Sequence, residues 1–318
     1  MLQQIIDWLV YSVFGFSLGS RLAEALNFFL YDSIKILLLL FSMIAVIGFA
    51  RSYISQTKVK EWILKKKVYG NIFASLFGSV TPFCSCSSIP IFLSFLEVGI
   101  PLGVTFSFLI TSPVINEYLV IVMLGFFGWK ITLLYVLSGI IIGVTSGLIL
   151  GKMNLERYLV KDLALPEGQR PKEKEYRGIK NRIRFGISEA ISITKRMWIW
   201  ILLGVGVGSL IHNYIPQETI QAIISKTGPF SVPLATMLGV PMYGSCAAIV
   251  PIAVVLFRKG VPLGTALSFM MATAALSFPE AVILRRAMKL QLIAIFFGIT
   301  TAAIIITGYL FNLIQSIL

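Results

Sequence analysis

The three cysteines are the residues of this chain best suited to chemistry. Cys84 and Cys86 lie in the stretch TPFCSCSSIP, between two long apolar runs, and Cys246 lies far downstream. Thiolates are soft ligands, and they suit soft species such as Cu(I), trivalent arsenic or trivalent antimony. The chain has a single histidine, so an imidazole zinc site or a Ser-His catalytic pair is nearly excluded. We therefore expect any metal at these thiols to be a soft metal or metalloid rather than zinc, calcium or magnesium.

The sequence around the first two cysteines predicts a helix that starts inside an apolar segment. Thr81-Pro82 is a good helix start, because a hydroxyl residue caps a helix and proline is favoured at the first helical position. Cys84-Ser85-Cys86 would then lie in the first turn, where free N–H groups and the helix dipole favour an anion or a thiolate. An irregular backbone at membrane depth is tolerated only inside the protein or beside a water-filled cavity. We therefore expect a discontinuous helix over 70–96, with a substrate site at its break.

The elements that carry these residues are expected to be membrane helices. Hydrophobic residues make up 57% of the chain and charged residues only 13%, with a mean hydropathy of +0.88, whereas a soluble domain has about 25% charged residues. The net charge of +13 does not indicate nucleic-acid binding, because most Lys and Arg lie in short breaks between apolar runs and no binding motif is present. The first residues lack the basic segment and cleavage site of a signal peptide, so we expect a first membrane helix there.

The chain repeats itself at a spacing of 161 residues. The recurring positions include Gly78 and Gly239, Gly99–Gly103 and Gly260–Gly264, Ser107-Phe108 and Ser268-Phe269, and, after a small gap, Ser85-Cys86 and Ser245-Cys246. The lysines of 58–67 are mostly lost from the second copy, while Glu97 is replaced by the basic pair Arg258-Lys259. Opposite charge bias in equivalent loops is typical of two halves inserted in opposite directions.

We expect an all-α polytopic membrane protein, built as an inverted repeat of two halves with broken helices and re-entrant helical hairpins. Its expected divisions are an N-terminal membrane helix over 1–32, a first membrane repeat over 33–151, a basic cytoplasmic linker over 152–194 and a second, inverted repeat over 195–318. The expected full spans lie near 5–29, 33–54, 70–96, 130–151, 195–214, 230–257 and 288–316. The linker is expected to contain an interfacial helix, because four isoleucines recur every fourth residue among Arg and Lys: Ile179, Ile183, Ile187 and Ile191.

Two further apolar segments, 101–127 and 262–287, are broken near their middles by proline and polar residues. We interpret each as a re-entrant hairpin; the alternative is that they cross fully, which gives eight or nine spans. The breaks offer Asn116, Glu117 and Glu280 as candidates for ion or proton coupling, because acids inside a membrane are usually functional.

Each of these candidates also has a purely structural explanation. A buried cysteine is often an inert small residue. Glu280 could close a capping box with Ser277, and a shallow hairpin would leave Glu117 at the surface.

Three blocks of the sequence resemble a known family. They are PFCSCS at 82–87, GIPLG at 99–103 and LSFPE at 276–280, and they resemble the predicted permeases that include the ArsP-type organoarsenical efflux permeases. The resemblance covers about residues 33–316. It implies a polytopic inner-membrane permease and, for characterised members, export of trivalent organoarsenicals through cysteine contacts, which would fall on Cys84, Cys86 and Cys246.

We therefore expect a permease, not an enzyme, that moves a small thiophilic solute through a cysteine-lined midplane site by alternating access. The expected substrate-binding residues are Thr81, Cys84, Ser85, Cys86, Tyr243, Ser245 and Cys246. The alternatives are a facilitator or channel for a small sulfur-containing anion and a membrane thiol oxidoreductase. No P-loop, nucleotide, quinone or flavin motif is visible, so no cofactor is expected. The expected partners are the lipid bilayer, a small-molecule or ion substrate and another copy of the chain, in the cytoplasmic membrane with the N-terminus and linker cytoplasmic.

Overall fold

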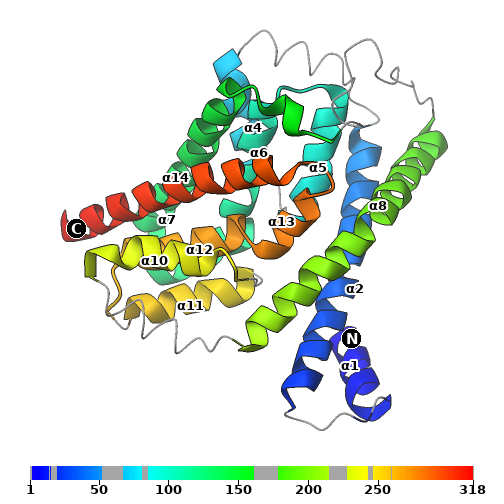
Figure 1. Ribbon diagram of the computed structural model, residues 1–318, viewed down its shortest axis with the longest axis horizontal. Coiled ribbons are helices and arrows are strands. Elements are labelled where there is room, and N and C mark those ends of the chain that lie inside the picture. Colours follow the sequence, from blue (N-terminus) through cyan, green and yellow to red (C-terminus); the bar gives the residue numbers. More distant parts are fainter. Residues whose placement is uncertain are drawn as a thin grey trace.

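The computed structural model of the chain describes residues 2–13, 15, 20–51, 67–80, 85–160, 178–214, 228–242, 246–258 and 260–317 (Figure 1). Within these ranges the structure is helical, and strand-like pairing is limited to one isolated bridge between Leu159 and Met288. Four helical stretches are long and apolar enough to cross a membrane: Ala23–Val46, Leu119–Lys152, Leu263–Leu284 and Leu290–Gln315. The predicted class, an all-α polytopic membrane protein, is confirmed.

The helices fall into two similar series along the chain. The first contains α1 (Leu2–Asp7), the π-helix η1 (Trp8–Val13), α2 (Arg21–Arg51), α4 (Lys67–Val80), α5 (Ser85–Val98), α6 (Leu102–Val114) and α7 (Glu117–Lys152). The second contains η2 (Leu155–Tyr158), α8 (Ile179–Tyr214), η4 (Gly228–Phe230), α10 (Ser231–Gly239), α11 (Cys246–Arg258), α12 (Leu263–Ala275), α13 (Phe278–Leu284) and α14 (Leu290–Ile317). Helices α5 and α11 begin 161 residues apart, and α6 and α12 both begin and end 161 residues apart, which is the spacing of the sequence repeat.

Equivalent glycines bring equivalent helices into backbone contact. A Cβ atom on Gly103 of α6 would lie 2.6 Å from the carbonyl oxygen of Gly147 in α7. At Gly264 of α12, the same added atom would collide with the carbonyl oxygen of Gly308 in α14. Gly264 follows Gly103 by 161 residues, and Gly308 follows Gly147 by the same number. The α6–α7 and α12–α14 crossings are therefore built in the same way.

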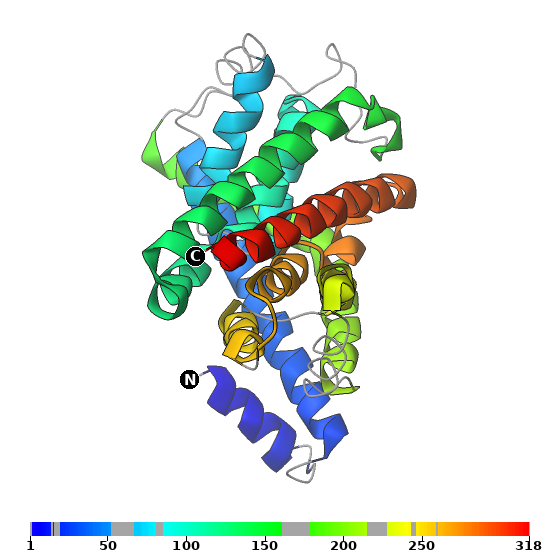
Figure 2. The same ribbon diagram turned by 90° about the vertical axis from the view of Figure 1, so that its left-hand side faces the viewer.

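Helices α2 and α8 lie side by side along one edge of the molecule and run in opposite directions (Figure 1). A Cβ on Gly48, near the end of α2, would lie 3.0 Å from Cα of Gly186, near the start of α8. Gly206, near the end of α8, faces Phe29, near the start of α2. Helices α7 and α14 also pack together, and Figure 2 shows their chains crossing in opposite directions.

Two helix boundaries differ from the sequence predictions. The helix expected over 5–29 is divided, because η1 ends at Val13, Gly15 has a positive φ of 68° and the Ser20 hydroxyl caps α2 by accepting from the Ala23 N–H at 3.1 Å. Helix α2 then continues through residue 32 without interruption. Likewise, α8 runs without a break across residue 194, so the expected interfacial helix and the following span are one helix. Small residues explain this continuity, because Gly186 and the buried Ala190 let the charged first half of α8 pack against α2.

The broken span expected over 70–96 is instead two short helices that both lie along α6. Asn71 of α4 donates to the Gly103 carbonyl at 3.0 Å, near the start of α6, and Thr111, near the end of α6, donates to Ser75 at 3.1 Å, so α4 runs parallel to α6. Helix α5 runs antiparallel to α6, because its Ser88 bonds to Ser112 at 2.8 Å, near the end of α6.

Helices α4 and α5 therefore form an antiparallel hairpin of two 14-residue helices. Helices α10 and α12 are joined like α4 and α6, through a 2.9 Å bond between Ser231 and Thr265. The prediction of one span over 230–257 is wrong in the same way, because α10 and α11 each pack against α12. Ser231 and Gly239 hold α10 along α12.

Candidate functional site

The first cysteine motif lies at the start of the second helix of a hairpin. Ser85 and Cys86 are the first two residues of α5, whereas Thr81, where the helix was predicted to start, and Cys84 lie outside the described residues. The bond between Ser88 and Ser112 fixes this end of α5 against the last turn of α6. The cysteine motif is thus held beside the point where α6 ends.

The third cysteine occupies the equivalent place in the second half. Cys246 is the first residue of α11, 161 residues after Ser85, the first residue of α5. Tyr243 and Ser245 lie outside the described residues. The structure therefore places Cys86 and Cys246 in the first turns of equivalent helices, while the gathering of all three sulfur atoms stays a prediction. Among the described side chains, no group of three or more His, Cys, Asp or Glu forms a metal site.

The helices that follow the hairpins break at equivalent positions. Helix α6 ends at Val114 and is followed by Ile115 in a non-helical conformation and by the buried Asn116. Helix α12 ends at Ala275 and is followed by Leu276, also non-helical, and by Ser277, which caps α13. Both breaks were expected. The first lies two to three residues beyond Ser112-Pro113, where the sequence suggested it, whereas the second includes Ser277, as predicted. The stretch Leu263–Leu284 is long enough to cross the membrane despite its break, which favours the alternative of a full span over 262–287.

The two acids of the breaks have different surroundings. Glu117 begins α7 and is exposed. Glu280 in α13 has an exposed fraction of 0%, and neither of its carboxyl oxygens has a hydrogen-bond partner. The Glu280 N–H donates to the Ser277 hydroxyl at 3.3 Å, but the carboxyl makes no bond in return. The capping box that the sequence suggested is therefore only half formed.

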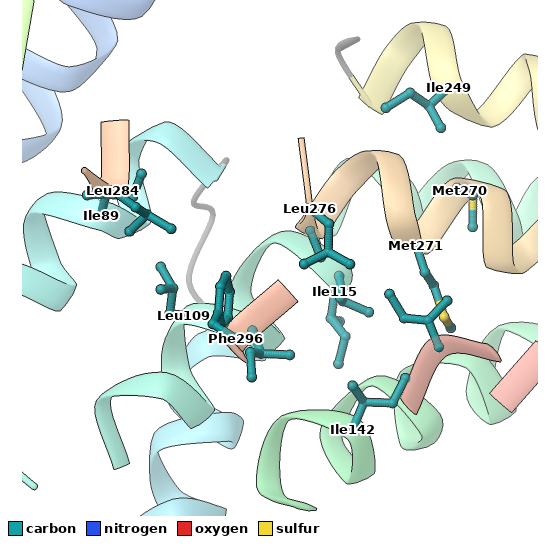
Figure 3. Packing of buried hydrophobic residues seen from close by; sticks show 14 of the residues in the cluster. Ile89, Leu109, Ile115, Ile142, Ile249, Met270, Met271, Leu276, Leu284 and Phe296 are labelled. Carbon is teal, nitrogen blue, oxygen red and sulfur yellow. The ribbon is translucent and has the colours of Figure 1, made fainter. Parts of the chain in front are cut away.

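Contacts between the halves bring these features into one core. Helices α6 and α12 pack together, α5 packs against α13, and α7 packs against both α11 and α14. Ile89 of α5 and Leu284 of α13 lie close together in Figure 3. Ile115 and Leu276, which begin the two breaks, belong to the same hydrophobic cluster. In each half, the helix that follows the break therefore packs against the other half: α7 contacts α11, and α13 contacts α5.

Several threonines that the sequence placed near the breaks have local partners. Thr111 donates to the Ser107 carbonyl at 2.8 Å, and Thr273 donates to the Phe269 carbonyl at 2.9 Å. Bonds of this kind stabilise buried hydroxyls within their own helices. The buried polar residues at the breaks themselves are Asn116, Ser277 and Glu280.

The sequence analysis missed the glycine series that positions the first break. Gly139, Gly143, Gly147 and Gly151 recur every fourth residue along α7 and face α6. A Cβ on Gly139 would lie 2.7 Å from the Ile115 side chain, so this series fixes the break residue closely. The spacing is a known signal for close packing of membrane helices and was readable in the sequence.

Comparison with known proteins identifies the family. A family model described as a predicted permease, of the ArsP type, matches residues 21–313. The chain is 22% identical over 300 residues to a putative two-component membrane permease complex subunit of Streptococcus mutans, covering 94% of this chain and 98% of that one. It is 23% identical to the UPF0718 protein YcgR of Bacillus subtilis, over 82% and 88% of the two chains. It is 19% identical to the UPF0718 protein MJ0584 of Methanocaldococcus jannaschii, over 76% and 81%.

No solved structure matches the chain significantly. The family model covers nearly all of the helices described above, including both hairpins and both breaks. Apolar helices and family together identify a multi-pass membrane protein and support a transport function. The chain belongs to the ArsP-type family of predicted permeases.

Proposed function

We propose that this permease moves a small thiophilic solute, of the trivalent metalloid or organoarsenical type, by alternating access through a site that includes Cys84, Cys86 and Cys246. The observation that carries the proposal is the position of the cysteine motifs. Cys86 and Cys246 lie in the first turns of equivalent helices, α5 and α11. Helix α5 packs against α13 and α11 packs against α7, so each contacts the helix that follows the break of the other half. Residues so placed can face one passage between the halves.

The inverted arrangement of the halves is the second part of the proposal. The equivalent helices α2 and α8 run antiparallel, and α7 and α14 cross in opposite directions (Figure 2). A two-fold axis would also exchange equivalent helices between the halves. The contacts agree with this, because α6 packs against its own equivalent, α12, and the contact of α5 with α13 has its counterpart in the contact of α11 with α7. Inverted halves that rock about a shared midplane site are a common basis of alternating access.

The proposed location is the cytoplasmic membrane, with the N-terminus and the basic linker over 152–194 on the cytoplasmic side. The argument is the positive-inside rule, because Lys and Arg are abundant in and around this linker. The first half of α8 supports a position at the membrane surface, because its four isoleucines at every fourth residue are exposed: Ile179, Ile183, Ile187 and Ile191.

The test measures transport by the purified protein in proteoliposomes. Methylarsenite, a trivalent thiophilic arsenical, is compared with arsenate, which does not bind thiols. We expect the native protein to move methylarsenite and not arsenate, and the variants Cys84→Ser, Cys86→Ser and Cys246→Ser to lose that transport. Ser79→Ala is the matched control, because Ser79 lies near the same hairpin but bonds to the Leu76 carbonyl within its own helix.

Two outcomes would count against the proposal. Full transport by all three cysteine variants would remove the cysteines from the site. Transport of thiosulfate or sulfite, with no movement of methylarsenite, would favour a pathway for small sulfur-containing anions, in which the free N–H groups at the starts of α5 and α11 bind the anion.

A further inference from the structure

We propose that Glu280 is a proton-binding site that couples transport to a proton gradient. The proposal deepens the proposed function and rests on it. Glu280 is fully buried within an apolar span, and both carboxyl oxygens lack a hydrogen-bond partner. Burying a carboxylate without a partner is costly, so acids in such places usually serve a function.

The fold does not require an acid at this position. The equivalent residue of the first half, 161 positions earlier, is Leu119, which also has an exposed fraction of 0%. An apolar side chain of similar length therefore fills the same place after the first break. The capping role is not fulfilled either, since the Glu280 carboxyl does not return the bond that the Ser277 hydroxyl accepts.

The surroundings of Glu280 suit a proton better than a metal cation. Hard cations need about six oxygen ligands, whereas the only polar contact recorded for Glu280 in the described part of the chain is with Ser277. Helix α13 packs against α8 and α5. Their charged and titratable residues are Lys180, Arg182, Arg184, Glu189, Lys195, Arg196, His212 and Tyr214 on α8 and Cys86 and Glu97 on α5. The side chains of Cys86, Glu97, Arg196, His212 and Tyr214 lie outside the described part of the structure, and none of the five described side chains forms an ion pair with Glu280. A proton is therefore the neutralising partner that we propose.

The position of Glu280 allows its charge to affect how α13 packs against α8 and α5. Helix α13 connects the second break to the α2–α8 pair, because it begins directly after Ser277 and packs against α8. Gaining or losing a proton changes the charge buried at this junction. The neutral form favours close packing of α13 against α8 and α5, and the charged form favours contact with water. Such a difference is what links an ion gradient to a conformational change.

The first test detects the proton itself and needs no substrate. The infrared C=O stretching band of a protonated carboxyl is followed during a pH titration of the purified protein in nanodiscs. We expect a titrating band that is absent from Glu280→Gln and from Glu280→Leu, which introduces the residue of the first half. Glu189→Gln, a partly buried acid on α8, is the control and should keep the band. An unchanged band in Glu280→Gln would overturn the proposal.

The second test measures coupling in proteoliposomes loaded with methylarsenite. An imposed pH gradient should accelerate transport by the native protein and by Glu189→Gln. In Glu280→Gln and Glu280→Leu the rates with and without the gradient should be equal, while downhill exchange continues. The coupling role would be overturned if the pH gradient still accelerated transport by both Glu280 variants. It would also be overturned if Glu189→Gln lost the acceleration to the same extent as the Glu280 variants.

The two readouts separate the failure of this inference from the failure of the proposed function. If the native protein moves no methylarsenite, the substrate proposal fails, and the infrared titration still decides whether Glu280 binds a proton. If Glu280→Gln does not fold, Glu280→Leu replaces it, because Leu119 shows that the equivalent site accepts leucine.

Discussion

The two breaks of the molecule lie at equivalent positions but are stabilised differently. At the first break, the Tyr135 hydroxyl donates to the Val114 carbonyl at 2.9 Å, which braces the last turn of α6. The equivalent of Tyr135 in the second half is Phe296, which has no hydroxyl and stacks on Phe106 at 5.3 Å. The second break also carries the unpaired Glu280. A repeated architecture thus carries one break that is braced by a hydroxyl bond and one that holds a buried carboxyl with no hydrogen-bond partner among the described residues.

The largest expected effect concerns the glycine crossings that the halves share. Gly103→Ala and Gly264→Ala should each destabilise the protein by about 1–3 kcal/mol, because the new methyl group would meet backbone atoms. The loss should be larger for Gly264, where the carbonyl oxygen of Gly308 is closer. The measurement is the midpoint of thermal unfolding in detergent.

Gly298→Ala is the matched control for these variants. Nothing lies within 4 Å of a Cβ at Gly298 of α14, so its midpoint should not fall. Equal effects at all three glycines would mean that helix propensity, and not close packing, explains the changes.

A second pair of variants compares the bonds between the hairpins and their neighbours. Asn71 donates to both the Gly103 carbonyl and the Ser107 hydroxyl, whereas Ser231 bonds to Thr265 alone. Asn71→Ala should therefore cost about 1–3 kcal/mol of stability and Ser231→Ala about 1 kcal/mol. Chemical denaturation of the reconstituted protein measures both, and a larger loss for Ser231→Ala would contradict the comparison.

The smallest expected effect concerns the brace at the first break. Tyr135→Phe removes the hydroxyl bond to Val114 and keeps the ring, so it should cost about 0.6–1.7 kcal/mol, the range for polar bonds between membrane helices. Hydrogen exchange of the amides just after the break should also become faster. If neither stability nor exchange changes, the difference between the two breaks does not depend on this bond.

The sequence predicted the repeat, its spacing and the two breaks, because glycine, proline and polar residues mark helix ends locally. It did not predict how α4 and α5 are arranged. A break in an apolar segment is compatible with two helices in line or two helices side by side, and the choice depends on distant contacts such as that of Asn71 with Gly103. The isolation of Glu280 was also hidden, because Ser277 and Glu280 have the spacing of a complete capping box.

The continuity of α8 was also not predicted. The isoleucines at every fourth residue among Arg and Lys predicted an interfacial helix that ends before the next span, whereas Ile179–Tyr214 is one helix whose Gly186 packs against α2. Continuity of a helix across a change in polarity is decided by the partner helix, which a single sequence does not reveal.

The glycine crossings limit where this protein can flex. At Gly103 and Gly147, and again at Gly264 and Gly308, main chain touches main chain without an intervening layer of side chains. Helices in such contact cannot slide past one another without first separating, so α6–α7 and α12–α14 must each travel as a unit. For the proposed alternating-access cycle, we therefore expect deformation where α5 meets α2 and where α13 meets α8. Cross-links placed across that boundary should stop transport, whereas cross-links within a crossing should not.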